Sequence, residues 1–196
     1  MYLINGTLSN SLPFRFHLPD GRTRTSLHEM SEAQLAELNI YPVDEIKPVL
    51  TWTQHHGTPE ITVTDSRATV TYPVVEYSPE EIAGILEAVK ERKRSEIAAA
   101  RWEEETAGID VNGFTVRTDR ESQALITGAA LKAMQDSEYS CRWKTESGFV
   151  ELSALQISAV ADAVRAHVQG CFDREAELLT LIEVATSPEE LAAISY

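Results

Sequence analysis

A short stretch in the second half of the chain, VNGFTVRTDRESQALITGA from Val111 to Ala129, constrains the fold most strongly. Asn112 and Gly113 stand between two short apolar runs, which is the strongest local signal for a β-hairpin turn. Asp119 is a preferred residue for capping a helix N-terminus, and Glu121 then falls in the first turn, where an acid is favoured. The stretch therefore predicts a hairpin that leads directly into a helix.

The helix that begins after Asp119 has four large apolar residues that we expect on its buried side: Leu125, Ile126, Leu131 and Met134. The small residues Gly128-Ala129-Ala130 would let another backbone approach closely. Arg120 and Gln123 are three positions apart and so lie on one face of the helix, where they could bond to the hairpin or to the long helix that follows it in the C-terminal part. We interpret this stretch as a structural joint in preference to a catalytic signature.

Long helices are predicted on both sides of this joint. Ser78-Pro79-Glu80-Glu81 supplies a cap, a proline at the first helical position and acids in the first turn. That helix should run to about Glu105 and end at Gly108, and its middle is charged all round, so we expect it to bridge two bodies or to enter an oligomeric bundle. Ser153 and Gln156 have the capping-box spacing and open a second helix of about thirty residues. Its expected apolar stripe is Ile157, Val160, Val164, Val168, Phe172, Leu178, Leu181 and Ile182.

The C-terminal part therefore has the order helix, hairpin, helix, hairpin, long helix. The second hairpin is expected from Tyr139 to Leu152 with its turn at Ser147-Gly148, and a last short helix from Ser187 to about Ile194. Because hairpins alternate with helices and no parallel βαβ pattern is present, the sequence favours the α+β class.

The first 77 residues have strand and turn signals. A short helix with a capping box at Ser31 should end at Tyr41-Pro42. Three strands are then expected at 48–56, 60–65 and 68–77, with turns at His55-His56-Gly57 and Asp65-Ser66-Arg67, and the prolines Pro48 and Pro73 indicate short or edge strands. The predicted organisation is a β-rich N-terminal module (1–77), a bridging helix (78–105) and a C-terminal α+β domain (106–196).

The net charge of −14 and the pI of about 4.7 argue against binding to nucleic acid, because phosphates would be repelled. The basic run KERKR, from Lys90 to Arg94, lies inside a predicted helix among glutamates and is interpreted as a solvated face. No apolar run is long enough to span a bilayer, and no signal peptide is evident, so we expect a soluble protein made in the cytoplasm. Two distant cysteines, Cys141 and Cys171, do not indicate a disulfide framework.

Residues with potential for chemistry are few. His167 and Cys171 are four apart on a helix and could face one ion, with Cys141 as a third ligand, but a place at the edge of the core is the simpler interpretation. The pair His55-His56 more readily marks a turn than a metal site, although a metal shared between subunits stays open. Glu103-Glu104-Glu105 is interpreted as a solvated acidic patch at a helix end.

No phosphate-binding, dinucleotide-binding, serine-nucleophile or zinc-protease motif is present, so no catalytic, metal or cofactor residue is predicted. The candidate interaction or structural residues are Trp102, Asn112, Gly113, Asp119, Arg120 and Gln123. Of these, Trp102 is the aromatic residue that we expect to hold the bridging helix against the C-terminal part.

The segment RWEEETAGIDVNGFTVRTDRESQALITGAALKAM, from Arg101 to Met134, resembles the start of the uncharacterised C-terminal domain of bacteriophage tail and tail-fibre-associated proteins. The stretch AVRAHVQGCFDREAEL (163–178) continues the resemblance, which covers about the C-terminal half. A looser likeness extends to AQLAELNIYPV (33–43). The matching residues are Thr118, Ser122 and all of the candidate residues named above except Trp102. The family gives none of them a proven role.

The resemblance implies association with a phage tail or its fibres and brings no catalytic activity. We therefore expect a non-enzymatic structural or adaptor protein of the virion tail, made in the host cytoplasm and homo-oligomeric, with tail or tail-fibre proteins as partners and no nucleic acid or membrane insertion. The alternative is a tail-fibre assembly chaperone that is absent from the mature virion, covering an exposed sheet edge until the fibre assembles. A third class of function is an enzyme acting on host surface polysaccharide or peptidoglycan. Only the many carboxylates favour it, and the sequence does not show which of them lie close together.

Overall fold

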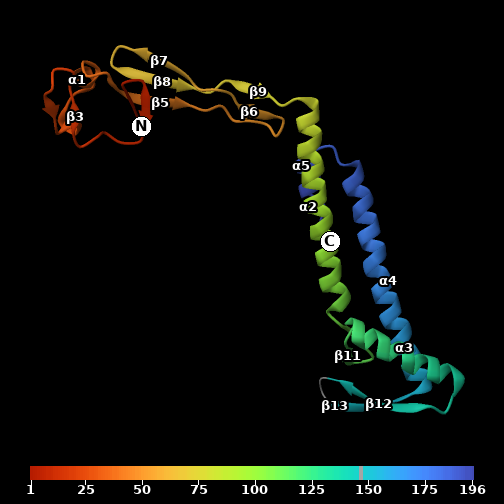
Figure 1. The fold of residues 1–196 in the computed structure, drawn as a ribbon. Coiled ribbons are helices and arrows are strands. Elements are labelled where there is room, and N and C mark those ends of the chain that lie inside the picture. The colour runs from red at the N-terminus through yellow and green to blue at the C-terminus, as the bar shows by residue number, and fades with distance from the viewer. Residues whose placement is uncertain (146–147) are drawn as a thin grey trace. The chain divides into compact units, whose positions relative to one another are not determined.

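The computed structural model describes residues 1–145 and 148–196, and it has the α+β architecture expected from the sequence (Figure 1). The chain divides into two compact units, Met1–Ile82 and Ala83–Tyr196, here called the N-terminal and C-terminal units. The expected hairpin turn at Ser147-Gly148 includes Ser147, which lies outside the described residues.

The N-terminal unit is built on a five-stranded sheet with the order β2-β1-β5-β8-β7. Its strands are β1 (Tyr2–Ile4), β2 (Thr7–Ser9), β5 (Ile40–Ile46), β7 (Glu60–Thr64) and β8 (Arg67–Thr71). The β5–β8 pair is parallel and the other pairs are antiparallel. The strand 60–65 and the turn at Asp65 are confirmed, since Asp65 has a φ of 53° between β7 and β8.

Three strands of this sheet were not predicted. β1 and β2 are joined by Asn5-Gly6, whose positive φ values of 49° and 81° give the same turn chemistry as Asn112-Gly113. β5 contains Pro42, which was expected only to end the preceding helix. The strand tolerates it because β5 changes partner at this point: Ile40–Pro42 pair with β1, whereas Val43–Ile46 pair with β8.

The expected strand 48–56 is wrong over most of its length. Only Gln54–His56 form a strand, β6, which pairs with β9 (Val74–Glu76) in a separate two-stranded sheet. His55 and His56 therefore lie within a strand and not in a turn. The expected strand 68–77 is divided into β8 and β9 around Pro73, whose missing N–H group cannot join a ladder.

A small core lies beside the first strands of the sheet. Buried residues come from β3 (Phe16–His17), the short 3₁₀ turn η1 (Leu27–Glu29), α1 (Glu32–Ala36) and β5: Phe16, Leu27, Leu35 and Ile40. β3 pairs with β4 (Thr23–Arg24). The predicted capping box of α1 is confirmed, because Ser31 and Gln34 exchange hydrogen bonds, but α1 ends at Ala36, before Tyr41-Pro42.

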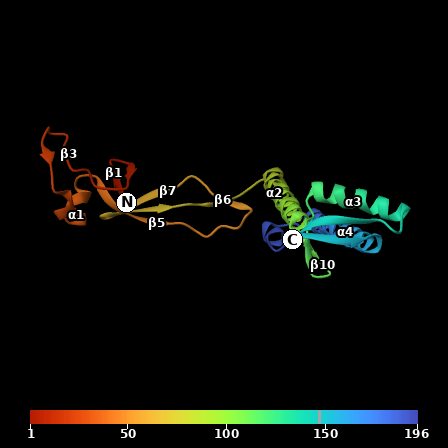
Figure 2. The same cartoon turned by 90° about the horizontal axis from the view of Figure 1, so that it is seen from below.

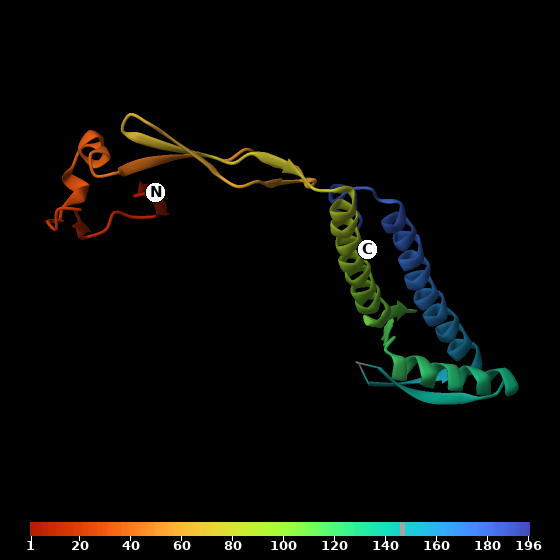
Figure 3. The ribbon, with the colours of Figure 1, turned by 45° about the horizontal axis from the view of Figure 1, so that its top comes forward.

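Two long helices lie side by side, α2 (Pro79–Thr106), which belongs to the C-terminal unit from Ala83 onward, and α4 (Ala154–Val184) (Figure 3). α2 begins after Ser78, whose hydroxyl accepts from the Glu81 N–H group, so the predicted cap is confirmed. The helices run antiparallel, since Lys90 reaches Glu183 while Arg101 reaches Glu175. Their shared core is Ile97, Leu178, Ile182, Ala185 and Leu191, the last from α5 (Pro188–Ala192).

The basic run in α2 is not a solvated face as predicted. Lys90 Nζ donates to the carbonyl oxygen of Glu183, 2.7 Å away in the last turn of α4, and Lys93 Nζ donates to the carbonyl oxygen of Ile194 at 3.3 Å. Arg94 forms ion pairs with Glu87, Glu91 and Glu183. Lys90 thus satisfies a carbonyl group that the end of α4 leaves without a helical partner, and it complements the negative end of the helix dipole.

Two hairpins and α3 complete the C-terminal unit. β10 (Ile109–Val111) and β11 (Phe114–Val116) enclose Asn112-Gly113, and α3 (Arg120–Gln135) follows the cap at Asp119, as predicted. β12 (Ser140–Thr145) pairs with β13 (Gly148–Ser153). α3 packs along α4 (Figure 2) through Ile126 against Val160 and Val164.

The expected apolar side of α3 is largely wrong. Ile126 is buried, but Leu125, Leu131 and Met134 are 59%, 57% and 80% exposed. The helix instead packs through Ile126 and Ala133, with Ala129 and Ala130 beside them, because small residues allow close approach to α4 and to the second hairpin. In the stripe of α4, Phe172 and Leu181 are likewise exposed, whereas the other members are buried or partly buried.

Candidate functional site

The residues that carry the family resemblance, between Asn112 and Gln123, are called the resemblance motif. They surround a buried polar group, the hydroxyl of Thr118, at the point where α2, the first hairpin and α3 meet. Thr118 has no exposed surface. Its Oγ1 donates to the carbonyl oxygen of Glu105 at 2.5 Å and accepts from the N–H group of Gly108 at 2.9 Å. Gly108 has a φ of 90°, and a Cβ there would lie 3.1 Å from the carbonyl oxygen of Val116. One hydroxyl thus ties the end of α2 to the segment that enters α3.

Charged side chains extend this contact toward α4. Glu105 is only 2% exposed, and its carboxylate pairs with Arg101, one turn earlier on α2. Arg101 Nε also donates to Glu175 of α4 at 3.2 Å, and its guanidinium lies 4.7 Å from the ring centroid of Phe172. The prediction of a solvated acidic patch is therefore wrong for Glu105. Paired charges are the usual condition for burying a carboxylate.

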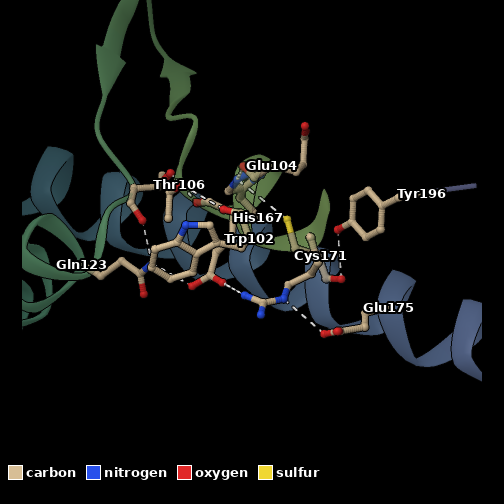
Figure 4. A network of polar contacts seen from close by, with 11 residues as sticks. Trp102, Glu104, Thr106, Gln123, His167, Cys171, Glu175 and Tyr196 are labelled. Atoms are coloured by element: carbon tan, nitrogen blue, oxygen red, sulfur yellow. Dashed lines mark hydrogen bonds and ion pairs between the residues drawn. The ribbon is translucent and has the colours of Figure 1, made fainter. Parts of the chain in front are cut away.

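Gln123 closes the arrangement from α3. Its Nε2 donates to the carbonyl oxygen of Thr118 at 2.6 Å and to Glu105 Oε1 at 3.3 Å. We call Arg101, Glu105, Thr118, Gln123 and Glu175 the junction cluster. Figure 4 shows Gln123 and Glu175 on opposite sides of this network, with Trp102 beside it.

The other predicted site residues take positions around the junction cluster. The Arg120 guanidinium lies 5.3 Å from the ring centroid of Trp102, so Arg120 and Gln123 both contact α2, the helix that precedes the hairpin. Trp102 remains 43% exposed. Asp119 accepts from the N–H group of Ser122 at 3.0 Å and pairs with Arg117. The hydrogen bonds to Ser122 hold the pKa of Asp119 below its ordinary value.

Asn112 and Gly113 lie apart from this group, at the exposed end of the first hairpin. Their φ values of 53° and 85° and the bond from the Gly113 N–H group to Asp110 Oδ1 at 3.0 Å define a tight turn. The structure thus brings Trp102, Asp119, Arg120 and Gln123 together and leaves the Asn112-Gly113 turn outside. Sequence reasoning missed Arg101, Glu105 and Glu175, although the spacing of Arg101 and Glu105 by four positions is a signal for an ion pair on a helix.

His167 and Cys171 lie beside the end of α2 (Figure 4). His167 Nε2 is 3.0 Å from the carbonyl oxygen of Glu104, and Cys171 Sγ is 3.9 Å from the same nitrogen. Figure 4 places both residues, with Tyr196, beside the end of α2. Across residues 1–145 and 148–196, no three His, Cys, Asp or Glu side chains are grouped so that they could hold a metal ion. Cys141 and Cys171 are free thiols.

Two surface hollows border the junction. One of about 420 Å³ lies between α3 and α4, is lined by both apolar and polar side chains, and is called the α3–α4 groove. The other, of about 660 Å³, lies between β11, the start of α3 and β12, and its rim mixes the bases Arg117, Arg142 and Lys144 with the acids Asp119 and Glu121. On the rim of the second hollow, the Ser122 hydroxyl donates to Asp119 Oδ2 at 2.8 Å.

Residues 88–195 match the family described as a domain of unknown function (DUF4376). The match covers more than half of the chain and includes the whole junction cluster, so the chain belongs to this family. No curated protein and no solved structure matches the chain. Within the described residues, the helices are too short or too polar to cross a membrane.

Replacing Thr118 by valine should lower the free energy of unfolding of the C-terminal unit by about 1–3 kcal/mol. Valine has the shape of threonine but leaves the Gly108 N–H group and the Glu105 carbonyl oxygen without their buried partner. Urea denaturation followed by far-UV circular dichroism measures the loss. Thr118→Ser keeps the hydroxyl and should lose less, and equal losses for the two variants would contradict a role for the hydroxyl.

Tyr196 should make the stability of the C-terminal unit sensitive to alkaline pH. Burial, together with the neighbouring Cys171 side chain, raises the pKa of Tyr196 to about 12 from 10.0. The Tyr196 hydroxyl also donates to the Cys171 carbonyl oxygen at 3.1 Å. Folding therefore favours the neutral phenol. The stabilisation that Tyr196 contributes to the folded unit is complete below pH 10 and is lost between about pH 10 and 12. The free energy of unfolding of Tyr196→Phe should fall less steeply over that pH range than that of the natural chain. An unchanged slope would contradict the assignment.

Proposed function

We propose that this protein is a non-enzymatic structural or adaptor component of a bacteriophage tail, which links or attaches tail fibres or baseplate parts. The proposal is supported first by the resemblance of Arg101–Met134 to the domain found in phage tail and tail-fibre-associated proteins. That segment lies inside the region that matches the family of unknown function. The protein would be made in the host cytoplasm, would join other tail proteins and would act as a homo-oligomer.

One structural observation carries the non-enzymatic part of the proposal. The polar residues of the resemblance motif are used inside the protein: Thr118 and Gln123 bond to Glu105 and Gly108, and Asp119 caps α3. A catalytic group must present a polar atom to a substrate. A motif whose polar atoms bond within the fold instead holds surfaces in position, and the apolar side chains that α3 and α4 leave exposed are suited to contact with another protein.

Mass spectrometry of purified virions tests the proposal. We expect peptides of this chain in particles that have been separated from lysate by density-gradient centrifugation, at a ratio to a known tail protein that stays constant through a second gradient. Particles grown with the gene deleted supply the control. Absence of the peptides from intact virions would overturn the assignment as a tail component.

A second function, a tail-fibre assembly chaperone, is favoured by the edge of the N-terminal sheet. β7 is an edge strand that is exposed along its whole length, with Ile61 and Val63 at 41% and 45%. An uncovered edge with apolar side chains can pair with a strand of another chain. Co-expression with the fibre protein distinguishes the two functions. A chaperone would raise the yield of soluble fibre trimer and be absent from virions, whereas unchanged fibre yield would exclude it.

A further inference from the structure

The α3–α4 groove has apolar side chains that nothing in the described chain covers. Its floor consists of Ile126 and Val164, which are buried, together with Ala130 and Ala161. Leu131 and Met134 stand at its side and are 57% and 80% exposed. Exposed large apolar residues beside an open apolar floor are typical of a contact surface between proteins. The small residues of the floor leave room for a side chain from outside.

Two charged residues of α4 indicate what the groove accepts. Asp162 and Arg165 both line it, are exposed and lie about one turn apart. Within residues 1–145 and 148–196, the side chain of neither residue forms an ion pair or a hydrogen bond. If α4 met a second α4 in antiparallel orientation, with a two-fold axis between these positions, each Asp162 would face Arg165 of the other copy. The same pair would then form twice, which is the self-complementarity that a two-fold interface requires.

The apolar residues fit the same symmetry. α3 runs antiparallel to α4, since Ile126 packs beside Val164 whereas Ala133 packs beside Ile157. Leu131 and Met134 therefore lie toward one end of the groove and Val168 toward the other. A two-fold axis near the middle would bring Leu131 and Met134 of one copy to Val168 of the second. One surface thus carries both the projecting side chains and the hollow that receives them.

We propose that two copies of this chain associate through the α3–α4 groove about a two-fold axis, with Asp162 of each copy paired with Arg165 of the other. This inference does not depend on the tail assignment, since it concerns the isolated protein. It also identifies the occupant of the groove as a second copy and not a small molecule or a different protein.

Charge exchange between single variants tests the proposal. Light scattering after size-exclusion chromatography of the full chain should give twice 21.8 kDa. Asp162→Arg places four cations around the axis, and Arg165→Asp places four carboxylates there, so each variant alone should dissociate at least about tenfold more readily. An equimolar mixture of the two variants should recover the dimer, because each aspartate then faces an arginine. The double variant D162R/R165D should recover it too.

Matched controls change the same charges elsewhere. Glu103 and Arg92 are exposed residues of α2 that do not line the groove. Glu103→Arg and Arg92→Asp should therefore dimerise like the natural chain, and circular dichroism checks that every variant is folded. A natural chain that stays monomeric up to about 100 µM, single variants that dimerise unchanged, or a mixture that fails to associate would each overturn the proposal.

Discussion

Replacing Arg101 by methionine should lower the free energy of unfolding of the C-terminal unit by about 3–5 kcal/mol, the largest loss that we expect from a single substitution. Arg101 is the cation that pairs with Glu105, whose side chain is 3% exposed, and it also reaches Glu175, whose side chain is 16% exposed. Methionine keeps much of the length and apolar volume but leaves the Glu105 carboxylate buried without a charged partner. Urea denaturation, followed at 222 nm because α2 and α4 supply most of the helix, measures the loss.

Two further variants separate charge burial from packing. Arg94 also pairs with three glutamates, but their side chains are 61–71% exposed, so Arg94→Met should cost only a small fraction of the Arg101 loss. The double variant R101M/E105L replaces the buried pair by apolar groups and should recover most of the stability. If Arg94→Met cost as much as Arg101→Met, or if the double variant recovered nothing, the buried pair would not explain the loss.

Replacing Ile182 by alanine should lower the free energy of unfolding by about 2–5 kcal/mol, because it removes a fully buried side chain from the contact between α2, α4 and α5. Ile182 has no exposed surface and packs with Ile97, Leu178 and Leu191. These residues join segments that are far apart in the sequence, so a cavity here weakens the whole helical pair. The same urea denaturation reports the effect.

Leu181 provides the matched control for Ile182. It is the preceding residue of the same helix, has a side chain of equal volume and is 51% exposed. Leu181→Ala should change the free energy of unfolding by less than about 1 kcal/mol. Similar losses at the two positions would mean that Leu181 is covered by another chain in solution or that the helical pair is packed differently.

The local signals in the sequence predicted the elements of the C-terminal unit well. Ser78, Asp119 and Ser153 cap their helices, and Asn112-Gly113 turns the first hairpin. These features depend on side chains that bond to the backbone within three residues, so they can be predicted from the sequence alone. The Asn5-Gly6 turn had the same signal and could have been predicted on the same grounds.

Contacts between distant segments could not be predicted in this way. The KERKR run has the composition of a solvated helical face, yet Lys90 and Lys93 bond to carbonyl oxygens of Glu183 and Ile194. Glu105 follows two other acids and is nevertheless buried, because Arg101, Gln123 and Thr118 converge on it. The buried side of α3 was also misplaced, since the preference for small residues against α4 outweighs the burial of Leu131 and Met134.

The central claim, that the resemblance motif works as a structural junction, is tested most directly by hydrogen exchange at one amide. The Gly108 N–H group donates to the buried hydroxyl of Thr118 at 2.9 Å. If that bond holds α2, the hairpin and α3 together, this amide should exchange only when the C-terminal unit unfolds, at a rate that rises with urea in step with the amides of Ile97 and Ile182. Exchange at Gly108 that is fast and independent of urea would contradict the claim.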